Sequence, residues 1–315
     1  MTFEDFIEEW HNEQEFIKVQ TSGSTGNPKI IELSKDFMVT SGQRTNSFFN
    51  INQKSRLHSC ISPDFIGGKM MAVRADIANA KLTWEMPSNE PLKRLRADDV
   101  LDLVAVVPSQ MIYILDNIEK MPKIKNIIIG GSPIHPDLKK KIAESGLNAY
   151  ETYGMTETSS HIALRKISQR DYPFTTLNGI KVNLDSIGCL KILFGNGLEI
   201  QTHDIAELIS PISFYIKGRI DDIIITGGKK LNPNEIENKI SHLINSPFCI
   251  TGFPDKKWGE KVILLIEGYQ DEWNLQELKE NLKETLVSWE IPKEIYFIKE
   301  FSRTTNGKIK RPKSL

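Results

Sequence analysis

The sequence predicts a large α/β domain followed by a smaller α+β domain. Three stretches of different character along the 315 residues support this prediction. Up to about residue 154, short β-rich runs alternate with helical periodicity, an order typical of parallel βαβ units. Between residues 161 and 217, strand-like runs follow one another without helices, which favours an antiparallel β subdomain. From residue 219 helices and strands mix again. We therefore expect domains at 1–218 and 219–315, with the boundary in the charged segment 219–222.

The elements follow from local patterns. Ser34, for example, offers the hydroxyl oxygen that helix N-caps prefer. The α/β region predicts strand 15–20, helix 34–49, strand 55–62, helix 68–80, strands 81–86 and 101–107, helix 109–121, strand 126–131, helix 137–145 and strand 149–154. The antiparallel region predicts strands 161–167, 180–185, 189–194, 198–204 and 213–218. The last region predicts helices 232–244 and 275–287 and strands 261–268 and 294–301.

Composition excludes several classes of protein. The formal net charge of −1 creates no overall field for nucleic acid or an anionic membrane. No apolar run approaches the ~18 residues of a membrane helix, and the acidic N-terminal segment does not resemble a signal peptide. The cysteines Cys60, Cys189 and Cys249 are far apart, with no metal-ligand spacing. We expect a protein of the reducing cytoplasm, with no nucleic-acid partner and no membrane insertion.

The segment Thr21–Lys29, "TSGSTGNPK", is too rich in small and hydroxyl residues for a simple connector. Glycine lets backbone N–H groups converge on an anion, and hydroxyls and a lysine add donors. The spacing is not that of the nucleoside-triphosphate P-loop, because only two residues separate Gly23 from Gly26 and Lys29 follows a proline. On composition, a phosphate-binding loop and a plain surface loop both stay open.

Five segments together resemble the adenylate-forming superfamily of acyl-CoA synthetases, luciferases and peptide-synthetase adenylation domains. They are "TSGSTGNPK" (21–29), "YGMTE" (153–157), "THD" (202–204), "GRIDDIIITGGKKLNPNEIE" (218–237) and "RTTNGKIKR" (303–311), in the family's order. The resemblance implies an enzyme that joins a carboxylate to ATP and then to CoA, with Mg²⁺. It also implies the superfamily's fold, with a mobile C-terminal domain. Because the first motif begins at residue 21, most of the usual N-terminal subdomain is absent, and a homodimer is one way of covering the surface this leaves.

The resemblance also implies roles for single residues. Lys308, Thr156 and Glu157 would be catalytic, with Glu157 holding Mg²⁺. Asp221 would be the hinge, and Gly228 would leave room for the pantetheine arm of CoA. The phosphates would bind Thr21, Ser22, Gly23, Ser24, Thr25, Gly26 and Lys29, and the adenine and ribose would bind Gly130, Gly131, Ser132, Tyr153, Gly154, Asp204 and Arg219. His203 stands where the family usually has glycine.

Among these enzymes the sequence most resembles the short o-succinylbenzoate–CoA ligases of menaquinone synthesis, through "GGKMMAVRA", "VVPSQM", "YETYGMTETSSHIALR" and "WGEKVILLIE". Their acid carries a second carboxylate, which needs a cationic or donor-rich anchor. The expected acyl-pocket residues are Phe65, Gly68, Lys69, Arg74, Ser159 and His161, with Arg165 as a further candidate anchor.

Other interpretations of the pocket stay open. Lys69 and Arg74 would point about 140° apart on a helix, so at most one faces the pocket. Either cation can instead lie on a helix surface, and His161 can be a core histidine. Asp64 suggests amino-acid activation as an alternative, and another acyl- or aryl-CoA ligase is a further one. A nucleotide-binding scaffold would explain the short N-terminus.

Overall fold

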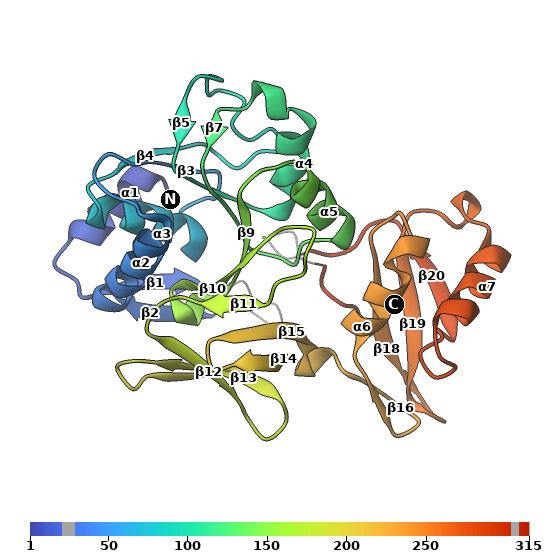
Figure 1. Cartoon of the computed structure of the whole chain (residues 1–315). Coiled ribbons are helices and arrows are strands. Elements are labelled where there is room, and N and C mark those ends of the chain that lie inside the picture. The colour runs from blue at the N-terminus through green and yellow to red at the C-terminus, as the bar shows by residue number, and fades with distance from the viewer. Residues whose placement is uncertain (21–28, 304–308, 315) are drawn as a thin grey trace. The chain divides into compact units, whose positions relative to one another are not determined.

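A computed structural model describes residues 1–20, 29–303 and 309–314 (Figure 1). The predicted phosphate-loop residues 21–26 and the predicted catalytic Lys308 lie outside this described part. The chain divides into two compact units. Among the described residues, the first comprises Met1–Lys181 and Leu193–Ile200, and the second comprises Val182–Ile192 and the described parts of 201–303 and 309–314. Within the described ranges, no helix combines the length and apolarity that crossing a membrane requires.

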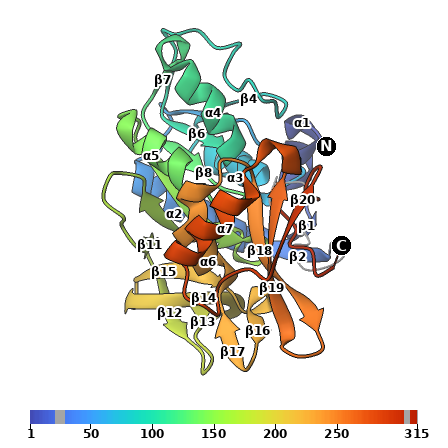
Figure 2. The same cartoon turned by 90° about the vertical axis from the view of Figure 1, so that its right-hand side faces the viewer.

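A parallel sheet forms the centre of the first unit. Its strands lie in the spatial order β4 (Lys81–Trp84), β3 (Arg56–Ser59), β6 (Leu103–Val106), β8 (Ile127–Ile129) and β9 (Ala149–Met155). Helices α2 (Lys35–Phe49) and α3 (Ile66–Ile77) lie on one face, and α4 (Pro108–Asp116) and α5 (Pro136–Glu144) on the other (Figures 1 and 2). Since parallel neighbours need such crossover helices, the predicted βαβ alternation is confirmed. The carboxyl ends of all these strands share one edge of the sheet.

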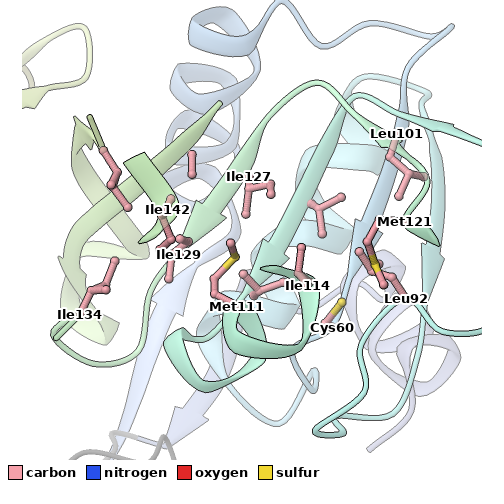
Figure 3. Packing of buried hydrophobic residues seen from close by; sticks show 14 residues of the cluster. Cys60, Leu92, Leu101, Met111, Ile114, Met121, Ile127, Ile129, Ile134 and Ile142 are labelled. Atoms are coloured by element: carbon pink, nitrogen blue, oxygen red, sulfur yellow. The ribbon is translucent and has the colours of Figure 1, made fainter. Parts of the chain in front are cut away.

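Apolar side chains fill the space between α4, α5 and the sheet. Met111 and Ile114 of α4 pack with Ile127 and Ile129 of β8 in one buried cluster (Figure 3). The cluster also contains Cys60, which directly follows β3. This core fixes the spacing of the strand ends that carry the site.

A second core lies under the N-terminal helix α1 (Phe3–His11). There Phe6 and Trp10 pack with apolar residues of α2, α3 and the strands β1 (Phe16–Gln20) and β2 (Ile30–Ser34). These two strands pair antiparallel and form a separate sheet. The predicted strand at 15–20 therefore exists but does not join the parallel sheet.

Antiparallel strands continue the chain after β9. β10 (Ser160–Lys166) pairs antiparallel with β9, and β11 (Phe174–Thr176) with β10. β12 (Ile180–Leu184), β13 (Cys189–Phe194), β14 (Glu199–Ser210) and β15 (Ser213–Arg219) then neighbour one another in chain order, with β14 and β15 antiparallel. The boundary between the two units runs through β12, β13 and β14. These strands confirm the predicted change to antiparallel pairing.

The rest of the second unit is a sheet with two helices. Its strands lie in the order β17 (Lys229–Leu231), β16 (Ile224–Thr226), β19 (Gly259–Glu267) and β18 (Phe248–Asp255), and β20 (Glu294–Ile298) pairs with β19. Ile236 and Ile240 of α6 (Pro233–Ile240) and Leu278 of α7 (Leu275–Thr285) pack onto one face of this sheet. The C-terminal segment is tied to this unit by the half-buried Arg311, whose guanidinium hydrogen-bonds Glu237 and Asn234.

The predicted helices and strands are present, with shifted ends. The predicted helix 109–121 stops at Asp116, where the Asn117 amide hydrogen-bonds the Tyr113 carbonyl at 3.0 Å and a short 3₁₀ turn follows. Elements that the sequence did not predict are α1, β2, β11, β16, β17, β18 and the short parallel pair β5 (Val100–Leu101) and β7 (Lys123–Ile124).

Candidate active site

The turn after β8 carries the predicted Gly130, Gly131 and Ser132. A Cβ atom on Gly130 would lie 2.5 Å from the Thr152 hydroxyl oxygen of β9, so this close approach requires glycine. Gly131 has a φ of +91°, which other residues rarely adopt. Because β8 and β9 are parallel neighbours, the glycine pair lies beside the carboxyl half of β9, which contains Tyr153. Two separate motifs thus meet at the sheet edge where open α/β sheets bind ligands.

The connection from β9 to β10 is tight and begins at Gly154. A Cβ atom there would lie 2.2 Å from the Ser160 carbonyl oxygen, so the return strand can pass only over a glycine. The Thr158 hydroxyl accepts a hydrogen bond from the Met155 N–H at 2.9 Å and lies 2.7 Å from the Ser160 carbonyl oxygen. These contacts fix the short 3₁₀ turn Thr156–Thr158 at the end of β9.

Two consecutive residues of this connection have a left-handed backbone. Ser159 has a φ of +53° and Ser160 a φ of +81°. Such conformations cost roughly 1–3 kcal/mol each and persist only where surrounding contacts enforce them. Ser159 is fully buried, and its carbonyl accepts a hydrogen bond from the Ser41 hydroxyl of α2 at 2.9 Å. Its own hydroxyl lies 3.3 Å from Met70 Sδ of α3. Helices α2 and α3 therefore hold the strained turn.

Glu157 lies in the first turn of this 3₁₀ helix and is exposed. Within the described ranges, its carboxylate has neither a hydrogen bond nor an ion pair. An exposed carboxylate at the edge of a nucleotide site is the type of ligand that Mg²⁺ takes together with phosphate oxygens. The exposure of Glu157 therefore fits the predicted role in binding Mg²⁺. It fits equally well an ordinary glutamate that is favoured at a helix start by the helix dipole.

Arg74 of α3 is the largest side chain that is fully buried, with 1% of its surface exposed. Its Nη2 lies 3.4 Å from both the Ser160 hydroxyl and His161 Nδ1, and its Nε has no hydrogen-bond partner. In the described parts of the chain no carboxylate pairs with it. Burial lowers the pKa of Arg74 to about 9, so the guanidinium is still charged at neutral pH. Buried charges in proteins are normally paired with an opposite charge, so an anion is the expected partner of this guanidinium.

His161 of β10 is also buried, between α2 and α3. Arg74 can only donate a hydrogen bond, so the neutral ring accepts at Nδ1 and carries its proton on Nε2. That proton is donated to the Thr45 hydroxyl at 3.0 Å, and Thr45 lies 3.4 Å from the Ser41 carbonyl oxygen. Burial, and then the charge of Arg74, holds the pKa of His161 well below its usual value. Both ring nitrogens of His161 have a hydrogen-bond partner, so the alternative of a core histidine fits this geometry. Through Nδ1 the ring also positions the Arg74 guanidinium.

The other two candidate anchors have partners of their own. The Lys69 ammonium lies 3.8 Å from the Glu9 carboxylate and 4.4 Å from the centre of the Phe6 ring, both on α1. Lys69 and Arg74 thus point to different neighbours of α3, as helical geometry predicts. Arg165 of β10 forms an ion pair with the buried Glu151 at 2.5 Å. Neither cation is left for a substrate in this structure.

The start of α3 carries the remaining acyl-pocket candidates. Phe65 is the N-cap residue and is half-buried. A Cβ atom on Gly68 would lie 2.2 Å from the Ser62 carbonyl oxygen, so glycine lets the helix pack against that turn. The exposed Asp64 pairs with the ammonium group of Met1 at 3.2 Å.

In the second unit, charged residues form a chain around Arg219 at the end of β15. Its guanidinium contacts Asp204 at 3.0 Å and Asp221 at 2.9 Å. His203 Nδ1 lies 2.9 Å from both carboxylate oxygens of Asp221. Burial opposes the charge of Arg219, but the nearby carboxylates keep its pKa above the usual value. The predicted ribose residue and the predicted hinge residue thus share one arginine.

The predicted Gly228 lies in the two-residue turn between β16 and β17. Gly227 and Gly228 have φ values of +54° and +78°, as hairpin turns of the primed types require. A Cβ atom on Gly228 would meet nothing within 4 Å, whereas one on Gly227 would lie 3.0 Å from the Trp258 ring. Gly228 therefore combines an open surface with a conformation that few other residues adopt.

Seven of the predicted site residues lie outside the described part of the chain, namely Thr21, Ser22, Gly23, Ser24, Thr25, Gly26 and Lys308. The predicted Lys29 is described and is exposed. Arg303 and Ile309, the described residues nearest to Lys308 on each side, form an antiparallel bridge.

Sequence reasoning missed the residues that hold His161 and Arg74, namely Thr45 and Ser160. Ser41 and Thr45 are four residues apart, on one buried face of α2. Two polar residues at helical spacing among buried neighbours are a signal of a polar site within a core.

The sequence matches two family models. The model of the AMP-binding enzymes matches residues 10–194, and that of the AMP-binding enzyme C-terminal domain matches residues 244–308. The chain is 29% identical over 265 residues to the 2-succinylbenzoate–CoA ligase of Lactococcus lactis subsp. lactis (strain IL1403). That alignment covers 77% of this chain and 57% of the relative, so this chain spans little more than half of the relative's length.

Solved structures are similar as well. An acyl-CoA synthetase (AMP-forming)/AMP-acid ligase II-like protein from Dyadobacter fermentans DSM 18053 is 32% identical, with a TM-score of 0.64, over 97% of this chain and 90% of that one. The o-succinylbenzoate coenzyme A synthetase from Bacillus subtilis, in complex with ATP and magnesium ion, is 20% identical, with a TM-score of 0.79, over 93% of this chain and 68% of that one. At that identity, the second similarity concerns the fold.

Proposed function

The chain belongs to the AMP-binding enzyme family, and on this basis we propose that it is an AMP-forming acid–CoA ligase. In the first half-reaction a carboxylate oxygen would attack the α-phosphate of ATP and expel pyrophosphate. In the second, the thiol of CoA would attack the acyl carbon and expel AMP. Such chemistry needs positioning and neutralisation of charge more than covalent help from the protein. The meeting of the glycine turn, Tyr153 and the Thr156–Thr158 turn at one sheet edge supports this proposal.

In the first unit, Gly130, Gly131 and Ser132 would border the adenine on one side and Tyr153 on the other. Thr156 would donate a hydrogen bond to the α-phosphate. Glu157 would hold Mg²⁺, which would neutralise phosphate charge. The loop Thr21–Gly26 and Lys29 would bind the outer phosphates.

In the second unit, Asp204 would accept hydrogen bonds from the ribose hydroxyls, and Arg219 would orient that carboxylate. Lys308 would stabilise the charge that develops between the carboxylate and the α-phosphate, a contribution of roughly 3 kcal/mol for one such donor. We keep the domain boundary at 218/219 and the hinge at Asp221 as parts of this proposal. Rotation about that hinge would withdraw Lys308 and bring in the Gly228 turn for the thiol.

The acid that we propose is an aromatic dicarboxylate of the o-succinylbenzoate type. The observation that carries this choice is Arg74, a fully buried guanidinium with no carboxylate partner in the described part of the chain and with an unpaired Nε. A second carboxylate on the acid would form an ion pair with this guanidinium, while the first carboxylate reacts with ATP. Ser160 and His161 hold the guanidinium from the side of the strained turn, which places the anchor next to the predicted nucleotide residues.

Another acyl- or aryl-CoA ligase is the alternative within the family. An amino-acid adenylating enzyme would need a carboxylate inside the pocket for the amino group, whereas the candidate Asp64 is exposed. A nucleotide-binding scaffold would have no use for an unpaired buried cation.

Pyrophosphate release tests the proposal with ATP, Mg²⁺ and a panel of acids, with and without CoA. Release with o-succinylbenzoate, with turnover that requires CoA, is the expected result. Release only with an amino acid would favour the adenylating enzyme. Nucleotide binding without release for any acid would favour the scaffold.

A further inference from the structure

Three potential metal ligands meet at the ends of β3 and β4, and none of them is among the residues assigned above. A nitrogen of His58, the sulfur of Cys60 and a carboxylate oxygen of Glu85 all lie within 4.8 Å of one another. His58 and Cys60 are 2% and 1% exposed, and Glu85 is half-buried. No sequence motif marks this group, because its members are spread over the ends of two strands.

The register of the two strands explains why the three side chains meet. His58 pairs with Thr83 and Ser59 with Trp84, so Cys60 and Glu85 come next along the two parallel strands. Residues two apart on a strand point to the same face. His58 and Cys60 are therefore on one face, directly beside Glu85.

The hydrogen bonds around His58 determine which nitrogen is available. The Thr83 hydroxyl donates to the Leu57 carbonyl at 3.2 Å, so it accepts the proton of His58 Nδ1 at 2.9 Å. His58 Nε2 then carries a lone pair and has no hydrogen-bond partner, although it is buried. Metal-binding histidines commonly donate their other N–H in this way, which fixes the ring and its tautomer. An unpaired buried acceptor beside a thiol and a carboxylate is a combination of groups that can bind a metal ion.

The other two groups fit the same role. The Cys60 sulfur lies within 4.8 Å of a Glu85 carboxylate oxygen, and Glu85 Oε1 accepts the Leu92 N–H at 2.7 Å, which orients the carboxylate. Burial raises the pKa of the Cys60 thiol, and Glu85 raises it further. A bound dication would reverse that preference, because its charge stabilises the thiolate. A neutral imidazole, a thiolate and a carboxylate together would balance the two charges of the ion.

We propose that His58, Cys60 and Glu85 bind one Zn²⁺ ion. Nitrogen, sulfur and oxygen ligands suit this ion, at bond lengths of about 2.0–2.3 Å. Ligand atoms around a tetrahedral ion lie about 3.5 Å apart, so the side chains need to close in by only about 1 Å. Binding releases the Cys60 proton to solvent. Water takes the fourth position, and the half-buried Glu85 marks the side from which the ion enters.

The consequence is a link between β3 and the segment after β4. Glu85 holds the loop backbone at Leu92, and the ion would join Glu85 to His58 and Cys60. Because the ligands meet only in the folded chain, the ion binds the native state and stabilises it.

Cobalt is the probe for the thiolate ligand. Protein without a histidine tag is stripped with a chelator, titrated with Co²⁺ and followed by absorption. We expect a thiolate-to-cobalt band that saturates at one ion per chain and that Zn²⁺ displaces. Cys60→Ser should abolish the band. Cys249→Ser is the matched control, because Cys249 is also a free, buried cysteine, and it should keep the band.

Two further measurements keep the test decisive if Cys60→Ser does not fold. His58→Asn should lower the affinity for Co²⁺ at least about tenfold, because the loss of an outer-shell partner of a ligand already costs about that much. Zn²⁺ should also raise the thermal midpoint of the wild-type protein in chelator-treated buffer. An unchanged band in Cys60→Ser would overturn the proposal. So would wild-type protein that binds no Co²⁺ and whose midpoint does not respond to Zn²⁺.

Discussion

Replacing Arg74 by methionine should separate acid recognition from folding. The substitution keeps most of the side-chain volume and removes the charge. Loss of one partner from a buried charge pair costs about 3 kcal/mol, which corresponds to a roughly hundredfold loss. We therefore expect kcat/KM for o-succinylbenzoate to fall about a hundredfold. A monocarboxylate analogue that lacks the distal carboxylate should lose less than about threefold, because it has no group for the guanidinium to bind.

The same substitution should have the opposite effect on stability. In the acid-free protein the Arg74 guanidinium is buried without a carboxylate, and its Nε is unsatisfied. Replacing a desolvated, unpaired charge by an apolar side chain of similar size is often neutral or stabilising, and we expect that gain to exceed the loss of the long 3.4 Å hydrogen bond to His161 Nδ1. The free energy of unfolding of Arg74→Met, from urea denaturation, should therefore equal or exceed that of the wild type.

Lys69→Met is the matched control. Lys69 is also a buried cation of α3, but its partner is Glu9. Its loss leaves the Glu9 carboxylate without its cation, so it should lower the free energy of unfolding by about 3 kcal/mol and leave the preference for the dicarboxylate unchanged. The assignment of Arg74 is wrong if Arg74→Met slows both acids equally, or if Lys69→Met alters the preference as strongly.

Three further predictions concern other residues. The pKa of His161 is lowered in the folded state, so below about pH 6.5 the unfolded state binds more protons than the folded state. The free energy of unfolding should therefore fall with decreasing pH by up to about 1.4 kcal/mol per pH unit. Urea titrations at several pH values should show a shallower fall for His161→Gln than for the wild type, and equal slopes would contradict this. Gly228→Leu should spare pyrophosphate release but block thioester formation, whereas Gly228→Asn, which tolerates positive φ, should keep more of the second step; equal loss of both steps in single-turnover assays would count against the tunnel. Lys308→Ala should slow adenylation by about two orders of magnitude with nearly unchanged ATP affinity, and an unaltered first half-reaction would remove its assignment.

Much of the fold was predictable because it depends on local patterns. The alternating apolar residues of β1 and the capped, periodic α2 are visible in a window of a few residues. β18 was missed, since Gly252 and Pro254 interrupt the alternation that marks a strand.

The site was predictable only in part. Helical geometry predicts that Lys69 and Arg74 diverge, but which of them meets a carboxylate depends on what packs against each face of α3. The pairing of Arg219 with both Asp204 and Asp221 depends on the register of β14 and β15. The group of His58, Cys60 and Glu85 likewise depends on strand register, which no local window contains. The roles of Thr21 and Lys308 still depend on resemblance.

Helix α3 is buried along most of its length and is held on two sides, by Glu9 through Lys69 and by His161 through Arg74. Such a helix has little freedom to shift when an acid enters. In the proposed enzyme, the distance from the guanidinium to the reacting carboxylate would then be nearly constant, and an acid one methylene shorter or longer would fit the two ends less well. Misfits of that size usually cost 1–3 kcal/mol. An enzyme built in this way would be selective for the length of its acid rather than only for its charge.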